Sequence, residues 1–146
     1  MNVNGLEQKN LPQNSIPRIL IAEDDISVLY ALEWVLGDIS CKVISAKNVE
    51  DAIKSAIEEK PDLAILDMRM PKSAKSAGLF IPFAGADICK ELRRRSATKD
   101  IPVIMLTVMS ESEGKLESFE AGANEYLTKP FNSETLLKAI NKYIKS

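Results

Sequence analysis

Apolar and polar residues alternate along the chain in blocks whose lengths and spacing predict its secondary structure. Short apolar runs bounded by polar residues are typical of strands that are buried on both faces of a sheet. Between these runs, apolar residues recur at i, i+3, i+4 and i+7, which is the spacing of one helix face. Strands are expected at 17–23, 42–46, 63–67, 102–107 and 125–128. Helices are expected at 27–36, 49–60, 85–95, 111–121 and 133–144.

The strict alternation of strands and helices predicts an α/β fold with a parallel sheet. Because crossover connections are right-handed, few topologies remain, and we expect a five-stranded, doubly wound (βα)5 sheet in the flavodoxin-like order 2-1-3-4-5. The fourth helix has the weakest pattern, since it contains Gly114 and little beyond Leu116 and Phe119 is expected to face inward. Residues 1–16 are rich in Asn and Gln and are predicted to form a disordered leader before one domain at 17–146.

The segment at 72–84 interrupts this alternation after the third strand. It is about 13 residues long, whereas strand-to-helix connections usually take about two to six residues. Its first half carries Lys and Ser, and its second half is apolar at 79–83. Two interpretations remain open: a loop that folds back onto the third helix through its apolar end, or a partner-docking or dimer surface beside the strand ends. The segment has no acidic residue, so it is not expected to bind a metal.

Polar residues with a shared chemistry follow four of the predicted strands. Glu23 and Asp24 end the first strand, Asp67 the third, Thr107 the fourth and Lys129 the fifth. In a parallel sheet these residues reach the same carboxyl edge, where open α/β folds bind ligands. Mg²⁺ prefers oxygen ligands and usually takes one or two carboxylates together with water and phosphate oxygens. The sequence therefore predicts a site for Mg²⁺, with Mn²⁺ as a possible substitute, and a phosphoryl group.

Each of these residues has a predicted role. Asp67 is the best nucleophile, because a carboxylate can attack phosphorus and form an acyl phosphate. Asp24 and Asp67 can bind the metal directly, and Glu23 can bind it directly or through water. Lys129 offers a positive charge and Thr107 a hydroxyl donor to the phosphate oxygens. Taken singly, each residue is more commonly a helix cap, a turn former or a solvated side chain, so the prediction depends on their joint occurrence.

Composition narrows the class of protein. The chain has 146 residues and a net charge of −2, which gives no electrostatic basis for binding nucleic acid. No apolar stretch approaches the roughly 20 residues needed to span a membrane. Cys41 and Cys89 are far apart and fit a reducing, cytoplasmic location. The chain contains no histidine, so a partner must supply the histidine in any phosphohistidine chemistry. The basic triplet 93–95 is expected to be a solvated helix end.

Four motifs together resemble the receiver domain of two-component response regulators, of the kind that includes the chemotaxis regulators. The resemblance covers residues 17–146. The matching stretches are Ile-Leu-Ile-Ala-Glu-Asp-Asp at 19–25, Pro-Asp-Leu-Ala-Ile-Leu-Asp-Met-Arg-Met-Pro at 61–71, Pro-Val-Ile-Met-Leu-Thr at 102–107 and Gly-Ala-Asn-Glu-Tyr-Leu-Thr-Lys-Pro-Phe at 122–131.

The resemblance implies a signalling switch that catalyses only its own phosphorylation and dephosphorylation. It makes Asp67 the acceptor for a histidine kinase or a phosphotransfer protein. It makes Glu23 and Asp24 the acidic metal pair and the backbone carbonyl of Arg69 a further metal ligand. Phosphorylation would then alter the surface formed by the fourth helix, the fifth strand and the fifth helix.

The same resemblance assigns the switch and the residues that tune it. Thr107 would be the switch hydroxyl, Tyr126 the aromatic side chain that moves with it, and Lys129 the phosphate-contacting cation, preceding a cis peptide bond to its proline. Three positions that tune dephosphorylation or access would be Arg69, Val108 and Met109. Because these side chains are bulky and none can accept a hydrogen bond strongly enough to orient an attacking water, a long-lived phosphorylated form is expected.

Two other functions compete with this one. An aspartate-nucleophile phosphatase usually carries a second Asp two residues after the nucleophile, where this chain has Arg69. A flavin-binding domain of this fold needs a loop rich in Ser, Thr and Gly after the first strand, where this chain has the acidic stretch 23–25. The sequence leaves open the cognate kinase, the signal, the output, the oligomeric state including a homodimer, and whether the domain stands alone or is part of a longer protein.

Overall fold

The computed structural model describes residues 16–76, 78–108 and 111–144, so most of the predicted leader and the tuning residue Met109 lie outside it. Five strands form one parallel sheet in the order β3-β2-β4-β7-β8, which confirms the predicted order 2-1-3-4-5. The strands are β2 (Arg18–Ala22), β3 (Lys42–Ala46), β4 (Leu63–Asp67), β7 (Val103–Thr107) and β8 (Glu125–Thr128).

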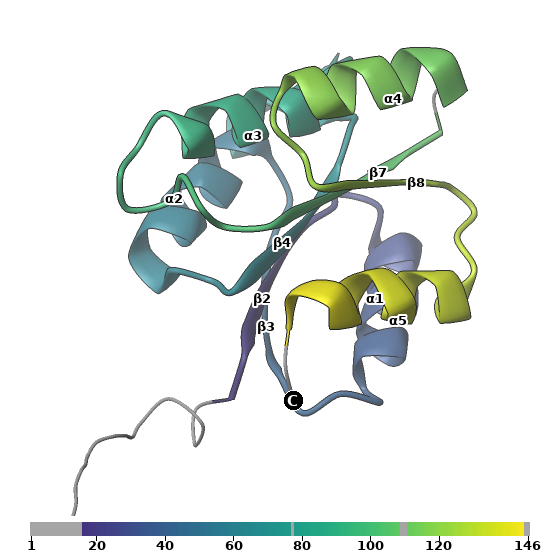
Figure 1. Ribbon diagram of the computed structural model, residues 1–146. Coiled ribbons are helices and arrows are strands. Elements are labelled where there is room, and N and C mark those ends of the chain that lie inside the picture. The colour runs from purple at the N-terminus through teal and green to yellow at the C-terminus, as the bar shows by residue number, and fades with distance from the viewer. Residues whose placement is uncertain (1–15, 77, 109–110, 145–146) are drawn as a thin grey trace, which may run out of the picture.

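Helices cover both faces of this sheet, as Figure 1 shows. They are α1 (Ile26–Leu36), α2 (Val49–Glu59), α3 (Ala84–Arg93), α4 (Glu111–Glu120) and α5 (Ser133–Tyr143). Helices α1 and α5 pack on one face, against Ile19, Ile65 and Ile104. Helices α2 and α3 pack on the other face, against Leu20 and Leu66. The α/β, doubly wound architecture is therefore confirmed. Within the described residues, no helix has the length and apolar character that crossing a membrane requires.

Side-chain caps fix where three of the helices begin. The Asp25 carboxylate accepts hydrogen bonds from the backbone N–H of Ser27 at 3.0 Å and from its hydroxyl at 2.8 Å. Asn48 accepts a bond from the N–H of Asp51 at 2.8 Å, and Asn132 caps α5 in the same way. Such caps satisfy N–H groups that have no partner inside the helix. Asp25 is thus the N-cap of α1, and this helix starts directly after the acidic pair.

The inserted segment folds into a small structure of its own. Strand β5 (Met70–Pro71) pairs antiparallel with β6 (Phe80–Ile81), and a single 3₁₀ turn, η2 (Ala74–Ser76), lies between them. The Lys72 carbonyl accepts a 2.9 Å bond from the N–H of Glu50 in the first turn of α2. Ile81 and Phe83 pack against the core beside α3, in agreement with the folded-back interpretation. Leu79 and Phe80 remain exposed, so only part of the apolar end is used for packing.

Helix α4 contacts the rest of the protein through small residues, which corrects the expectation that Leu116 and Phe119 face inward. Both of these side chains are exposed. The buried positions are Gly114, Ser118 and Ala121, which follow one another at i, i+4 and i+7 and so share a helix face. The Ser118 hydroxyl donates a 2.6 Å hydrogen bond to the Gly114 carbonyl. Small side chains let the helix lie close to its neighbours but bury little apolar surface.

The basic triplet at 93–95 was expected to be a solvated helix end. In the structure this holds for only two of its three residues. Arg94 and Arg95 form exposed ion pairs with Glu91. Arg93 is instead half-buried, and α3 ends there rather than at Arg95. Its guanidinium donates to carbonyl and amide oxygens of two connecting segments. These acceptors are the carbonyls of Lys99, Ile101 and Gly122 and the side chain of Asn124. Arg93 therefore ties the end of α3 to the turn that follows α4.

Candidate functional site

Three predicted carboxylates meet at the carboxyl edge of the sheet. Strands β2 and β4 are neighbours, with Ala22 opposite Leu66. Glu23, which follows β2, therefore lies beside Asp67, which ends β4. In this cluster of Glu23, Asp24 and Asp67, one carboxylate oxygen of each residue lies within 4.8 Å of an oxygen of the other two. Glu23 is only 1% exposed and Asp67 6%. The structure therefore brings together the acidic cluster that the strand ends predict.

Lys129 lies between two of these carboxylates. Its Nζ atom is 2.8 Å from Glu23 Oε1 and 3.2 Å from Asp67 Oδ1. Its own N–H donates a 2.9 Å bond to the Thr107 carbonyl, so β7 positions the segment that carries the ammonium. The peptide bond between Lys129 and Pro130 is cis, as the resemblance implied. The lysine thus neutralises part of the acidic cluster before any ligand binds.

The cluster has more negative charge than Lys129 can balance. Burial and the charge of Asp67 raise the pKa of Glu23 to about 7, against the opposing influence of Lys129. The same two causes raise the pKa of Asp24. Burial alone would lower the pKa of Lys129, but its hydrogen bond to Glu23 and the charge of Asp67 outweigh burial and raise it. Crowded carboxylates of this kind repel one another unless a cation joins them, so the cluster fits a divalent metal ion.

The predicted switch residues lie on the neighbouring strands. Thr107 ends β7 and is fully buried. The residue before Thr107, Leu106, pairs with Asp67 of β4. Tyr126 is half-buried on β8, opposite Met105 of β7. Strand β7 therefore lies between the strand that ends in Asp67 and the strand that carries Tyr126.

A cavity of about 400 Å³ opens over the acidic cluster and Lys129. Two of the three predicted tuning residues, Arg69 and Val108, line this cavity. The backbone N–H of Arg69 donates a 3.4 Å hydrogen bond to Asp67 Oδ1. The cavity also contains Phe80 from β6, which the sequence did not single out. The unusual length of the insertion pointed to this region, but length alone does not show which of its residues lines the cavity with Asp67. The cavity is lined by Glu23, Asp24, Asp25, Asp67, Arg69, Phe80, Val108 and Lys129.

Gly85, in the first turn of α3, makes a second contact that the sequence did not reveal. A Cβ atom placed there would lie 2.6 Å from the backbone oxygen of Asp67 and 2.6 Å from Met105 Sδ. The N–H of Gly85 also donates a 3.2 Å bond to the Met68 carbonyl. Only glycine permits this close approach, so α3 directly supports the backbone of the proposed acceptor.

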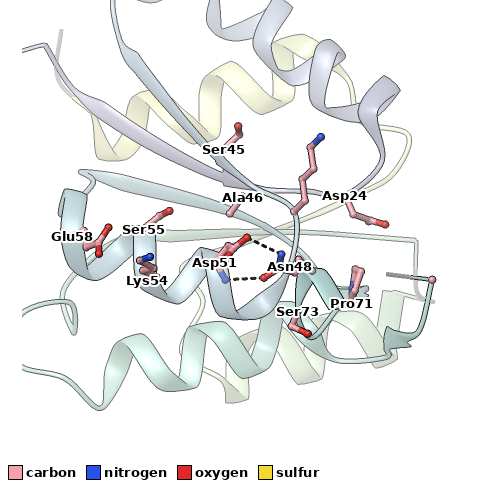
Figure 2. A pocket seen from close by; sticks show the side chains of 13 residues that line it. Asp24, Ser45, Ala46, Asn48, Asp51, Lys54, Ser55, Glu58, Pro71 and Ser73 are labelled. Carbon is pink, nitrogen blue, oxygen red and sulfur yellow. Dashed lines mark hydrogen bonds between the residues drawn. The ribbon is translucent and has the colours of Figure 1, made fainter. Parts of the chain in front are cut away.

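A larger cavity of about 720 Å³ lies beside the site, between the end of β3, α2 and the inserted segment, as Figure 2 shows. Asp24 lines both cavities, but neither Asp67 nor Lys129 lines the larger one. There Asn48 and Asp51 hydrogen-bond to each other and cap α2 (Figure 2). Of the two cavities, Asp67 and Lys129 therefore line the smaller one.

The fold and this site define an α/β signalling domain with an acidic, lysine-containing pocket at the strand ends. The chain belongs to the response regulator receiver domain family, whose model matches residues 19–141. Receiver domains bind Mg²⁺ at an acidic pocket and interact with histidine kinases or phosphotransfer proteins. The fold and the family membership predicted from the sequence are both confirmed.

Individual relatives agree with this assignment. The chain is 33% identical over 133 residues to the DNA-binding dual master transcriptional regulator RpaA of Synechocystis, covering 89% of this chain and 50% of that protein. The chain thus spans about half the length of the curated relatives it matches. The chemotaxis response regulator CheY4 of Vibrio cholerae is 30% identical with a TM-score of 0.75, covering 89% of this chain and all of that chain.

One similar structure contains the metal. The receiver domain of the sensor histidine kinase PA1611 from Pseudomonas aeruginosa PAO1, with a magnesium ion coordinated in its active-site cleft, is 25% identical and has a TM-score of 0.75. The match covers 90% of this chain and 100% of that chain.

Proposed function

We propose that this chain is a phosphorylation-activated receiver in which Asp67 accepts a phosphoryl group from a histidine kinase or a phosphotransfer protein. The observation that carries the proposal is the position of Asp67. Its Oδ1 atom lies 3.2 Å from Lys129 Nζ, and its carboxylate also belongs to a three-carboxylate cluster at the sheet edge.

The proposed step needs little from the protein beyond alignment and charge. A carboxylate oxygen of Asp67 forms a bond to phosphorus while the phosphorus–nitrogen bond of the donor breaks. The electron pair of that bond stays on the imidazole nitrogen of the donor. The donor histidine belongs to a partner protein, since this chain has no histidine. Lys129 would neutralise a phosphoryl oxygen, and the Thr107 hydroxyl would donate to another.

Magnesium is the proposed cofactor. Glu23, Asp24 and Asp67 would hold the ion, together with the backbone carbonyl of Arg69. When bound, Mg²⁺ supplies positive charge to the oxygens of the transferring group. Carboxylate and carbonyl ligands also suit Mn²⁺, which is therefore the proposed substitute.

The proposed output surface is formed by α4, β8 and α5. Phosphorylation would draw Thr107 toward the new phosphoryl group and Tyr126 after it, shifting the balance between two conformations. Helix α4 can respond because it is attached through Gly114, Ser118 and Ala121, which bury little apolar area. A target protein, an output domain or a second copy of the chain would bind this surface. The free thiols Cys41 and Cys89 support a cytoplasmic location.

Intact mass spectrometry tests the acceptor. Wild-type protein incubated with Mg²⁺ and acetyl phosphate is expected to gain one acid-labile phosphoryl group, and Asp67→Asn is expected to gain none. Asp87→Asn, at an exposed position on α3, is the matched control and should behave as wild type. Excess chelator should abolish the modification in all three proteins. Full modification of Asp67→Asn would refute the proposal.

A further inference from the structure

The cavity above Asp67 has two apolar side chains among otherwise charged ones. Phe80 from β6 and Val108 after β7 both line it, together with Asp67 and Lys129. Phe80 is 47% exposed and Val108 63% exposed. Phe80 is thus only half-covered by the rest of the protein, although large apolar residues are stabilised mainly by burial. Phe80 and Val108 are therefore both accessible to a molecule that approaches Asp67.

The position of Phe80 is fixed by its surroundings. It pairs with Pro71 in the β5–β6 ribbon, and β5 begins three positions after Asp67 at Met70. Met70 and Pro71 are buried, and Ile81 packs on the core. The ribbon is therefore anchored on both sides of Phe80, and its register determines where the aromatic ring stands relative to the acceptor.

We propose that Phe80 is a specificity-determining residue that, with Val108, forms an apolar rim over the acceptor carboxylate; this rests on the function proposed above. The rim disfavours small polar donors and water, because neither side chain can hydrogen-bond to them. It favours a phosphorylated imidazole, whose flat ring can pack against the edge or face of Phe80. The insertion thereby selects a histidine-bearing protein donor and protects the acyl phosphate from hydrolysis.

Two substitutions separate the effect of the aromatic ring of Phe80 from the effect of its size. Phe80→Ala removes both, whereas Phe80→Leu keeps an apolar side chain but removes the aromatic face. Leu79→Ala is the matched control, because Leu79 belongs to the same inserted segment and is 72% exposed but does not line the cavity. Thermal unfolding with and without Mg²⁺ verifies that each variant retains its fold and its metal site.

Three rates are measured for each protein: phosphorylation by acetyl phosphate, phosphorylation by phosphoimidazole, and decay of the phosphoprotein after donor removal. Phe80→Ala is expected to accelerate decay and acetyl phosphate use by about tenfold, the lower end of what one apolar contact contributes to discrimination. Its preference for phosphoimidazole over acetyl phosphate should fall by a similar factor. Phe80→Leu should decay as slowly as wild type and yet lose the preference for phosphoimidazole.

The outcomes distinguish this proposal from the one on which it rests. If Phe80→Ala matches Leu79→Ala in all three rates while wild type is phosphorylated on Asp67, the rim proposal is wrong and the receiver function stands. If wild type is not phosphorylated by either donor, the receiver function is wrong and the rim proposal falls with it. If Phe80→Leu keeps the full preference for phosphoimidazole, the aromatic ring has no part in donor selection.

Discussion

The inner and outer sides of the cavity over Asp67 are built differently. The inner side consists of Glu23, Asp67 and Lys129, which are buried or nearly so and come from the ends of paired strands. The outer side includes Phe80 and Val108, which are exposed and come from connecting segments. The register of the sheet fixes the inner side, whereas the length and fold of an insertion fix the outer side. In the two proposals above, the sheet supplies the chemistry and the insertion adjusts its rate and its donor.

The largest effect is expected on the inner side, from Lys129→Met. This change removes the ammonium that lies 2.8 Å from Glu23 and 3.2 Å from Asp67. The rate of phosphorylation by acetyl phosphate should fall about 100-fold, as when one charged or donor group is removed from a reacting centre. Lys142→Met is the control, because Lys142 forms an exposed ion pair with Glu125. A near-normal rate in Lys129→Met would show that the buried side does not supply the chemistry.

Gly85→Ala probes the backbone beneath the acceptor. The added methyl group would lie 2.6 Å from the Asp67 carbonyl oxygen, so α3 or the end of β4 must shift. We expect the free energy of unfolding in urea to fall by about 1–3 kcal/mol, which is typical of overpacking. Gly37→Ala serves as a comparison, because the nearest atom there is 3.2 Å away, and its stability should stay close to wild type. Equal stability of the two variants would argue against tight support of the acceptor.

A smaller effect is expected from pH. Because the pKa of Glu23 is raised from its usual value to about 7, Glu23 is mostly protonated in the metal-free protein at pH 6 and mostly ionised at pH 8. The proton competes with Mg²⁺, so Mg²⁺ affinity should fall about tenfold from pH 8 to pH 6. Calorimetric titration at the two pH values measures this change.

Stability without metal should follow the opposite trend. A carboxyl group whose folded-state pKa lies above its unfolded value destabilises the folded state when it ionises, so stability falls as pH rises from about 4.5 to about 7. Glu23→Gln is the control and should lose both dependences. If Mg²⁺ affinity and metal-free stability depend on pH in the same way in wild type and Glu23→Gln, the raised pKa of Glu23 does not govern metal binding.

Much of the inner side could be predicted from the sequence, because buried parallel strands leave a strong pattern and their ends must meet. The cluster of Glu23, Asp24 and Asp67 followed from that rule alone. The outer side could not be predicted, since Phe80 reaches the cavity only through the register of a two-residue ribbon. Helix α4 was misjudged for a related reason: Leu116 and Phe119 look like core residues, but small residues make its buried face.

The bonds that Arg93 makes to the Gly122 carbonyl have a mechanical consequence for α4. We expect these bonds to hold the end of this ten-residue helix in place, so that the beginning, which follows Thr107 along the chain, would move most. At 1.5 Å per residue the helix is a lever about 15 Å long. A rotation of about 10° around the fixed end would therefore move the other end by roughly 2.6 Å. A displacement of the threonine would therefore be felt most at the beginning of α4, by about half as much at Leu116 near its middle, and least at Phe119 beside the fixed end.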